Sequence, residues 1–454
     1  MGRAALVPSP PLVTSNSVPE ERPSTPGTPE GVPGVVQPAV VTGSGDLVRR
    51  AAWSTGGIVA QGVARLAYTV VIGRALGSAD LGHVSAVLSL SIFAALVWPT
   101  AAGNAASRYI AFAVARGQDD RDVVRLLTRT WALSVVVLGA VAVPVAWGWT
   151  HDGVLAATAA WTVAGYGAYA YARTGALGRG RARRVGLADV GTGLLSLAGL
   201  AGVLAVGSDS LVLVPISVGY TVFAVVCWPK GVAGPTELPR TGVLSFTAWN
   251  VLAGLATNGL LQLAMISAEV FAAPAQVGVY AAAFTIATPA SMVGQAVSQI
   301  IVPAFAHETG NGSLRDRRRL AVFLVFTAGC VVVFGAIAAL AGFVMPLFYP
   351  EQGVAAAPVL RGLLVGVFVF TIALVPAAFL LAAGRSGEVA VASLTGLVAG
   401  VVVIAVSVSS APLTAGTTGF VVGSVVSLVA LVAVGFRPGR ASDGSQTKRR
   451  ATVQ

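Results

Sequence analysis

Residues 320–345 read LAVFLVFTAGCVVVFGAIAALAGFVM, and none of these 26 residues carries a charge. The stretch follows directly on four basic residues, Arg315, Arg317, Arg318 and Arg319. A helix of about 20 apolar residues crosses the roughly 30 Å hydrocarbon core of a bilayer. The stretch therefore predicts a transmembrane helix whose first turn lies at a membrane surface.

Similar apolar runs recur along most of the chain. The chain is 55% hydrophobic and only 10% charged, whereas roughly a quarter of the residues of a soluble domain are charged. The runs predict an all-α integral membrane protein of about 12 transmembrane helices. The predicted spans are 51–73, 82–104, 130–149, 154–175, 185–206, 211–229, 244–267, 277–303, 320–345, 358–383, 388–408 and 413–436.

The basic residues lie almost entirely on one side of these spans. If the N-terminus is cytoplasmic, 26 of the 29 Lys and Arg residues fall in cytoplasmic segments; only Arg74 and Arg361 lie at the outer side, and Arg65 lies within a span. This bias predicts a multi-pass protein of the plasma (inner) membrane with both termini in the cytoplasm. The basic residues come in short bursts without interleaved aromatic residues, which argues against nucleic acid as a partner. Arg outnumbers Lys 27 to 2, as is typical of a bacterium with a GC-rich genome.

An internal repeat divides the chain into two halves. Residues 80–90 and 276–286 lie 196 positions apart, and each stretch has a polar residue, an aliphatic residue and a glycine before an apolar span. Six spans per unit give both units the same orientation, related by a pseudo-twofold along the membrane normal with a cavity between them. The predicted lobes are 47–229 and 244–436, joined by a cytoplasmic linker at 230–243. This organisation is typical of transporters.

The two ends of the chain are predicted to lie in the cytoplasm. Residues 1–46 contain nine prolines with many Ser, Thr and Gly residues. Such a composition buries too little apolar area to offset chain entropy, so the tail is predicted to be disordered. Residues 437–454 form a short basic tail.

Enzymatic and metal chemistry find no support in the sequence. The outer loops are short and carry only scattered acids, and no Gly-rich phosphate loop ends in Lys-Ser/Thr. No cluster of His, Cys and carboxylate residues has metal-ligand spacing. Cys227 and Cys330 lie in apolar runs, where we expect them to serve as small packing groups. We therefore predict no enzyme, no cofactor and no metal site.

The most informative polar residue is Arg65, in the first span. It lies about eight residues, or roughly 12 Å, from the outer end of its helix. An unpaired arginine at a helix centre costs roughly 2.5–3.5 kcal/mol on insertion scales, so Arg65 should face protein or water. Gln61 lies one turn earlier on the same face. The pair indicates either an anion-binding site in the central cavity or an interhelical contact that holds one lobe together.

Other polar residues within the spans extend the candidate site. Asn104 and Arg108 stand four residues apart at the cytoplasmic end of the second span. There Arg108 would either receive a phosphate or only follow the positive-inside bias. In the second unit, Asn250, Asn258 and Gln262 on the seventh span and Gln295 and Gln299 on the eighth form polar stripes. These side chains would either bind sugar hydroxyls or hold helices together.

Asp189 is the one acid that the sequence places near the interior of a span. It would either couple transport to protons or sodium, or pair with the nearby Arg183 or Arg184. The histidines His83, His151 and His307 are expected to be loop or interface residues without visible partners.

One region resembles a known family. Residues 72–82 (IGRALGSADLG), followed by a span that ends with residues 103–111 (GNAASRYIA), resemble the opening of the polysaccharide (O-antigen type) flippases. These belong to the multidrug/oligosaccharidyl-lipid/polysaccharide exporter superfamily. The chain departs from the family at His83, where an aromatic residue is common. It also lacks the carboxylate that the drug-extruding branch usually carries in the first span, and the two further spans usual in the lipid II flippase branch.

The resemblance implies alternating access between two lobes. The cargo would be a polyprenyl-diphosphate-linked oligosaccharide moved from the inner to the outer leaflet for cell-surface polysaccharide biosynthesis, with Arg65 and Arg108 receiving the diphosphate. Partners would be membrane lipids and the glycan polymerase and glycosyltransferases of the same pathway. Two alternatives stay open: a multidrug or small-solute secondary antiporter, and a scaffold or membrane enzyme of envelope assembly.

Overall fold

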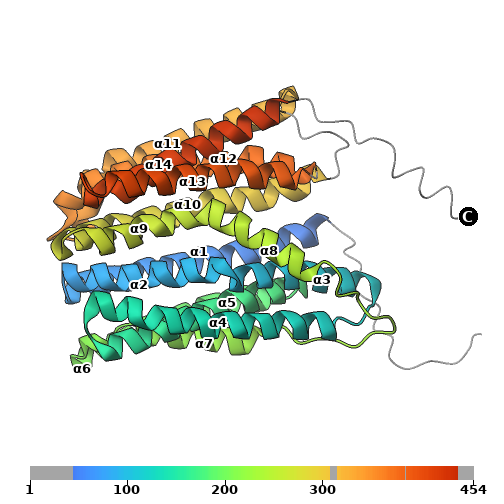
Figure 1. Ribbon diagram of the computed structural model, residues 1–454, viewed down its shortest axis with the longest axis horizontal. Helices are drawn as coiled ribbons and strands as arrows, with labels where there is room; N and C mark the ends of the chain where they lie inside the picture. Colours follow the sequence, from blue (N-terminus) through green and yellow to red (C-terminus); the bar gives the residue numbers. More distant parts are fainter. Residues whose placement is uncertain (1–43, 307–313, 384, 438–454) are drawn as a thin grey trace, which may run out of the picture. The chain divides into compact units, whose positions relative to one another are not determined.

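The computed structural model describes residues 44–306, 314–383 and 385–437 (Figure 1), but for 44–48, 50, 51 and 292–306 it describes the backbone alone. Within these ranges the chain is helical, and its β-type pairing is one isolated bridge between Asp119 and Glu237. The α-helices are α1 (Ser44–Ala75), α2 (Ser78–Val97), α3 (Pro99–Arg116), α4 (Arg121–Thr150), α5 (Gly153–Gly178), α6 (Ala182–Val206), α7 (Val214–Cys227), α8 (Val243–Gly254), α9 (Leu260–Phe271), α10 (Pro274–Ala306), α11 (Arg317–Phe348), α12 (Gly353–Ala382), α13 (Ser386–Ser407) and α14 (Pro412–Phe436). A 3₁₀ turn, η1 (Asp209–Leu211), precedes α7, and a π-helical turn, η2 (Leu255–Gly259), joins α8 to α9.

These elements give the predicted all-α membrane fold with twelve crossings. Two crossings are interrupted: α2 and α3 share the second, and α8, η2 and α9 share the seventh. The break at Trp98 comes just before Pro99, which has no backbone N–H to donate and therefore begins a new helix. In the described part of the chain, ten helical stretches are long and apolar enough to cross a membrane by themselves; α5 and α10 complete the twelve.

The helix boundaries correct the sequence analysis at the arginine-rich end. α1 begins at Ser44, so residues 44–46 of the segment predicted to be disordered are helical, whereas residues 1–43 lie outside the described residues. α3 runs on to Arg116 and α4 starts at Arg121. The predicted basic loop 105–129 is therefore mostly two helix ends, because charged residues beyond an apolar run still form helix where water can solvate them.

The helices pack in two groups (Figure 1), which we name the α1–α7 group and the α8–α14 group. In the first, α1 packs on α6, and α5 packs on α3, α4 and α7. In the second, α10 packs on α12, and α14 packs on α12 and α13. Between the groups, α2 contacts α9 and α10, and α1 contacts α10. α8 also lies against α3, so the groups meet at both ends of the helices.

The glycines of the internal repeat lie at the contact between the groups. A Cβ atom added to Gly278 would stand 2.3 Å from the carbonyl oxygen of Ser78, and one added to Gly82 would stand 2.9 Å from Val277. Helices in lipid pack closely where small residues let their backbones approach. Each repeat unit therefore uses its glycine to bring α2 and α10 together, which gives the weak sequence repeat a packing role.

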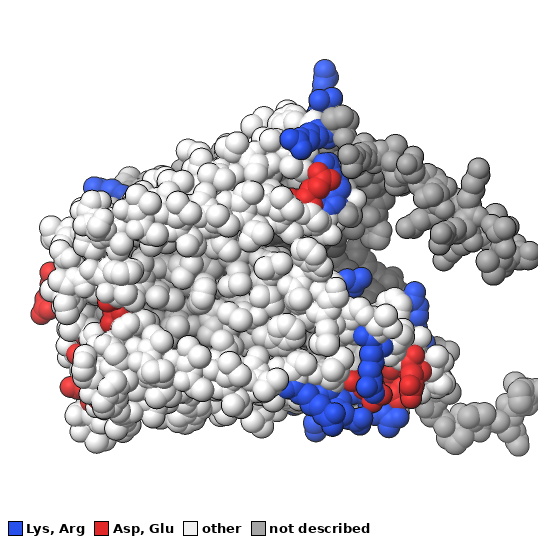
Figure 2. Space-filling view, in the orientation of Figure 1, with Lys and Arg blue, Asp and Glu red and all other residues white. Residues whose placement is uncertain are grey.

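Charged side chains gather at the two ends of the described helices (Figure 2). Between them lies a broad uncharged surface. Many large apolar side chains are exposed along the helices, among them Val136 on α4 at 69% and Phe343 on α11 at 70%. An apolar surface of this extent is stable against lipid tails but not against water. Lys and Arg concentrate at one end, which we call the arginine-rich end. The protein is a multi-pass membrane protein.

Candidate functional site

Arg65 lies beside a small cavity between the two groups of helices. The cavity is lined by Gly62, Arg65, Leu66 and Thr69 from α1, Ser85 and Leu88 from α2, and Phe284, Thr285, Thr288 and Pro289 from α10. The side chain of Arg65 is half-buried and makes no hydrogen bond or ion pair with the described residues. The phenols of Tyr166 and Tyr220 lie within electrostatic range of it. A cation in such a place, with hydroxyl groups on the facing wall, can receive an anion.

Gln61 does not line that cavity. Its side-chain oxygen lies 3.4 Å from the position that a Cβ on Gly193 would take, so it points towards α6 within its own group. The same oxygen is buried without a hydrogen-bond partner. The two residues of the predicted pair therefore diverge, with Arg65 facing the contact between the groups and Gln61 facing the interior of the α1–α7 group.

Asn104 and Arg108 stand one turn apart near the middle of α3. The guanidinium of Arg108 lies 4.4 Å from the ring centroid of Phe246 on α8. Phe246 also meets Tyr109 edge-on, with 6.1 Å between the ring centroids. Such cation–π contact leaves the outer edge of a guanidinium free to bind. Arg108 is thus exposed at a contact between the groups, away from the cavity beside Arg65.

Asn258 and Gln262 lie around the π-helical turn of the seventh crossing. Asn258 is in η2, and its Nδ2 donates a hydrogen bond to Thr257 Oγ1 over 3.0 Å. Gln262 is 4% exposed, and its side-chain oxygen is buried without a hydrogen-bond partner. The adjacent Thr257 lines a second cavity, enclosed by η2, α12, α13 and α14. Gln295 and Gln299 are in the part of α10 whose side chains lie outside the described residues.

Asp189 forms a buried ion pair, and its partner differs from the predicted one. Its Oδ2 accepts a hydrogen bond from Arg173 Nε over 3.2 Å, and its Oδ1 accepts one from Tyr169 over 2.9 Å. Arg173 also donates to the carbonyl of Ser54 on α1 over 2.9 Å. The prediction of a pair with Arg183 or Arg184 is wrong.

The reason for this error is the true position of Arg173. We counted this residue, near the end of the predicted span 154–175, among the cytoplasmic charges, but it lies inside α5 and is only 8% exposed. Tyr169 and Arg173 are four residues apart and therefore share the helix face that meets α6. The carboxylate of Asp189 has a salt bridge and a phenol hydrogen bond, which ties α1, α5 and α6 together. Its predicted role in ion coupling stays a prediction.

Sequence reasoning missed an acid–base pair at the end opposite the arginines. His83 Nδ1 lies 2.6 Å from Glu269 Oε1, and the Glu269 side chain is 3% exposed. We expected His83 to have no partner and placed Glu269 in a loop, but the pair joins α2 to α9 across the two groups. Nearby, Arg74 Nε on α1 donates to the carbonyl of Phe348 at the end of α11 over 2.9 Å. Positions 186 residues apart leave no local pattern from which this pairing could be read.

Because these contacts close the groups against each other, weakening them should open that end. The measurement is the rate at which a membrane-impermeant maleimide labels a cysteine placed at Thr288 in the cavity. For Glu269→Gln we expect labelling to be about tenfold faster, because a hydrogen bond to a charged group contributes about 1.5–3 kcal/mol. The background would carry Cys227→Ala and Cys330→Ala. Glu351→Gln removes an exposed acid at the same end and should leave the rate unchanged. Equal rates in both variants would show that the pair does not hold the groups together.

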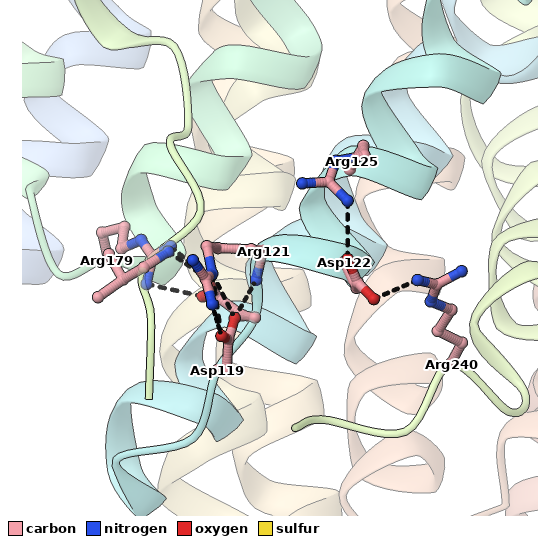
Figure 3. A network of polar contacts seen from close by, with 8 residues as sticks. Asp119, Arg121, Asp122, Arg125, Arg179 and Arg240 are labelled. Atoms are coloured by element: carbon pink, nitrogen blue, oxygen red, sulfur yellow. Dashed lines mark hydrogen bonds and ion pairs between the residues drawn. The ribbon is translucent and has the colours of Figure 1, made fainter. Parts of the chain in front are cut away.

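At the arginine-rich end, an acidic turn between α3 and α4 holds the segment that follows α7 (Figure 3). Asp120 Oδ1 accepts hydrogen bonds from the backbone N–H of Val232 over 2.7 Å and from Arg179 over 2.9 Å. The backbone of Asp119 pairs with that of Thr236 and Leu238. Asp122 contacts Arg240, at the end of the same segment. We call this set of contacts the linker clasp.

The acidic turn that carries the linker clasp should keep its Asp119–Arg121 pair in mildly acidic solution. Hydrogen bonds from the Arg121 guanidinium lower the pKa of Asp119 from 3.8 to about 2. A carboxyl whose pKa is lowered on folding stabilises the fold above its ordinary value, and that contribution is lost as the pH falls through the lowered value. The Asp119 contribution is therefore fully present above about pH 4 and disappears towards pH 2.

Removing the buried member of the clasp should free the segment. Asp120→Ala leaves the Val232 amide and the Arg179 guanidinium without their acceptor, at a cost of about 1–3 kcal/mol. We expect tryptic cleavage after Lys230 and Arg240 to accelerate about tenfold or more, since cleavage follows local opening. Asp122→Ala removes a more exposed acid and serves as the control, with cleavage after Lys230 unchanged. Resistance of the Asp120 variant would show that other contacts hold the segment.

Comparison with known proteins gives the class of fold. The chain matches no protein-family model and no curated protein sequence. Its fold is that of the transporters of the MOP superfamily, the exporters already named above. An inward-facing multidrug resistance MATE family transporter of that superfamily superposes with a TM-score of 0.64 at 16% identity, covering 88% of this chain and 96% of that one.

Two further structures of the same class are similar. The lipid II flippase MurJ in an inward closed conformation gives a TM-score of 0.64 at 10% identity, covering 84% of this chain and 87% of that one. A MOP superfamily transporter from Pyrococcus furiosus, described as having a binding pocket of reverse polarity, gives 0.61 at 16% identity, covering 86% and 94%. At these identities the likeness defines the fold.

Proposed function

We propose that this protein moves a polyprenyl-diphosphate-linked oligosaccharide from the inner to the outer leaflet by alternating access. The observation that carries the proposal is the Arg65 guanidinium, which lies without a described partner beside a cavity between two groups of membrane helices. The MOP-type fold supports a transporter, and the likeness to a lipid II flippase supports a lipid-linked cargo. The protein would then belong to the family of the polysaccharide flippases.

The chemistry of Arg65 fits a diphosphate. A guanidinium presents paired N–H donors that match two phosphate oxygens, and such charge-assisted bonds are about twice as strong as neutral ones. Within a membrane protein the effective dielectric constant is low, so the attraction exceeds that at a water-exposed site. The neutral hydroxyls of Thr69, Ser85 and Thr288 add hydrogen-bonding groups without repelling an anion. Arg108 would meet the cargo first, at the arginine-rich end.

With this function we also propose an orientation of the protein in the membrane and a division of the chain into lobes, linker and tails. The arginine-rich end would face the cytoplasm, with both termini on that side. The lobes would be 47–229 and 244–436, the linker 230–243, and the tails 1–46 and 437–454. Its partners would be the glycosyltransferases of the pathway, which supply the lipid-linked glycan, and the glycan polymerase, which consumes it.

Proteoliposomes test the proposal directly. The full chain would be reconstituted with a fluorescent polyprenyl-diphosphate oligosaccharide, and the fraction of probe quenched by a membrane-impermeant reductant would be followed. We expect the quenched fraction to rise from half, as in protein-free vesicles, towards completion. A headgroup-labelled phosphatidylcholine should not be moved. Movement of both lipids, or of neither, would refute the proposed specificity.

The alternative of a multidrug or small-solute antiporter rests on the likeness to a MATE family transporter. The described lining of the cavity argues against cationic drugs, because it holds an arginine and no carboxylate. Efflux of ethidium driven by a proton or sodium gradient in the same vesicles, without movement of the lipid-linked probe, would favour the antiporter.

A further inference from the structure

Three arginines surround a surface groove that the proposed transport does not use. The groove has a volume of ≈ 540 Å³ and lies where the turn between α5 and α6 meets the end of α7. Arg181, Arg183 and Arg184 line it together with the apolar residues Leu187, Ala188 and Val226. Leu187 is 52% exposed and Val226 is 41% exposed. The lining of the groove thus combines cationic and apolar side chains.

The three guanidinium groups differ from their neighbours in having no counter-charge. Arg173 pairs with Asp189, and Arg179 pairs with Asp120. In the part of the chain that the structure describes, the side chains of Arg181, Arg183 and Arg184 make no hydrogen bond or ion pair, and no acid lines their groove. Like charges three residues apart on a helix repel each other. An anion from outside the chain would relieve that repulsion.

The backbone at the same place also favours an anion. α6 begins at Ala182 directly behind Arg181, and no side chain caps it. The first N–H groups of a helix have no partner within the helix and carry a partial positive charge. Three exposed arginines and these amides therefore lie together at the start of α6, beside the groove.

We propose that this groove binds one anionic phospholipid from the leaflet at the arginine-rich end. The phosphate would lie among Arg181, Arg183 and Arg184, and an acyl chain would lie along Leu187 and Val226. A lipid would contact both the arginines and the apolar residues of the groove, whereas a soluble phosphate would contact only the arginines. Basic pockets between transmembrane helices are suited to anionic headgroups. The site is separate from the cavity beside Arg65.

Lipid titration tests this site. The full chain would be purified in detergent, delipidated and titrated with phosphatidylglycerol, with retained lipid counted by native mass spectrometry. We expect the variant Arg181→Gln/Arg183→Gln/Arg184→Gln to bind the tightest-held lipid about 100-fold more weakly, since each arginine near a charged surface contributes about fivefold. The matched control Arg116→Gln/Arg129→Gln/Arg437→Gln removes the same charge at the same end and should bind within about twofold of the unaltered chain.

Two further measurements distinguish binding of a lipid headgroup from binding of a soluble phosphate and from loss of fold. Replacing the same three arginines by lysine keeps the charge and should retain most of the affinity, which excludes loss of fold as the cause. Glycerol phosphate should neither bind nor compete at concentrations where the lipid saturates. Equal binding of phosphatidylcholine, competition by glycerol phosphate, or unchanged binding in the glutamine variant would each overturn the proposal.

Discussion

Arg65→Ala should abolish movement of the lipid-linked oligosaccharide while leaving the amount of folded protein unchanged. The guanidinium would donate at least two charge-assisted hydrogen bonds to the diphosphate, each contributing about 1.5–3 kcal/mol. Their loss corresponds to a fall in rate of about 100-fold or more in the vesicle assay. Arg65→Lys keeps the charge but not the paired donors, so it should recover part of the rate.

The neighbouring Gln61 provides the matched control. It is on the same helix one turn away, but it points towards α6 and not into the cavity. We expect Gln61→Ala to transport at close to the original rate. Full activity of Arg65→Ala would remove this residue from the site. A lowered melting temperature for both Arg65 variants would instead show that Arg65 holds helices together.

Asp189→Asn should destabilise the protein more than any other single carboxylate change described here. The Asp189 side chain is 0% exposed and that of Arg173 10%. Removing one partner of a buried pair leaves the other charge uncompensated, which typically costs about 3–5 kcal/mol. The melting temperature in detergent should fall accordingly. Arg173→Met in the same chain removes the stranded charge, so the double variant should be more stable than Asp189→Asn alone.

Asp122→Asn is the control for that measurement. Asp122 is 34% exposed and pairs with exposed arginines at the arginine-rich end, and such surface pairs contribute about 0–1 kcal/mol. If Asp189→Asn kept its stability but lost the dependence of transport on a proton or sodium gradient, Asp189 would be a coupling residue. A loss of stability without that change would assign it to the framework of the α1–α7 group.

The apolar runs predicted the crossings well, because crossing a membrane constrains composition directly. The glycines at 82 and 278 were also visible as a repeat, although their contact with the opposite helix was not. The breaks were not predicted. Pro99 gives a local signal for the first. The second is the π-helical turn at Leu255–Gly259, which includes Asn258, a residue that we interpreted as part of a polar stripe and not as a break.

The partners of charged residues were harder to predict than the positions of those residues along the spans. Arg173 was misplaced because a charge near the end of an apolar run suggests a loop, whereas a buried acid on α6 draws it into the protein. The pair of His83 with Glu269 depends on how two distant helices meet. Arg65 could be singled out from sequence because a charge deep in a span is costly, but the direction of Gln61 required the position of α6.

The linker clasp shortens the flexible connection between the two groups of helices. The connection after α7 runs to Gly242, but its residues up to Arg240 are held at the turn between α3 and α4, so only Thr241 and Gly242 lie between that contact and α8. An extended chain gains at most about 3.6 Å per residue, so the start of α8 can travel only about 11 Å from Arg240. Any large swing of one group against the other must therefore pivot near this point, with its greatest arc at the far end of the helices.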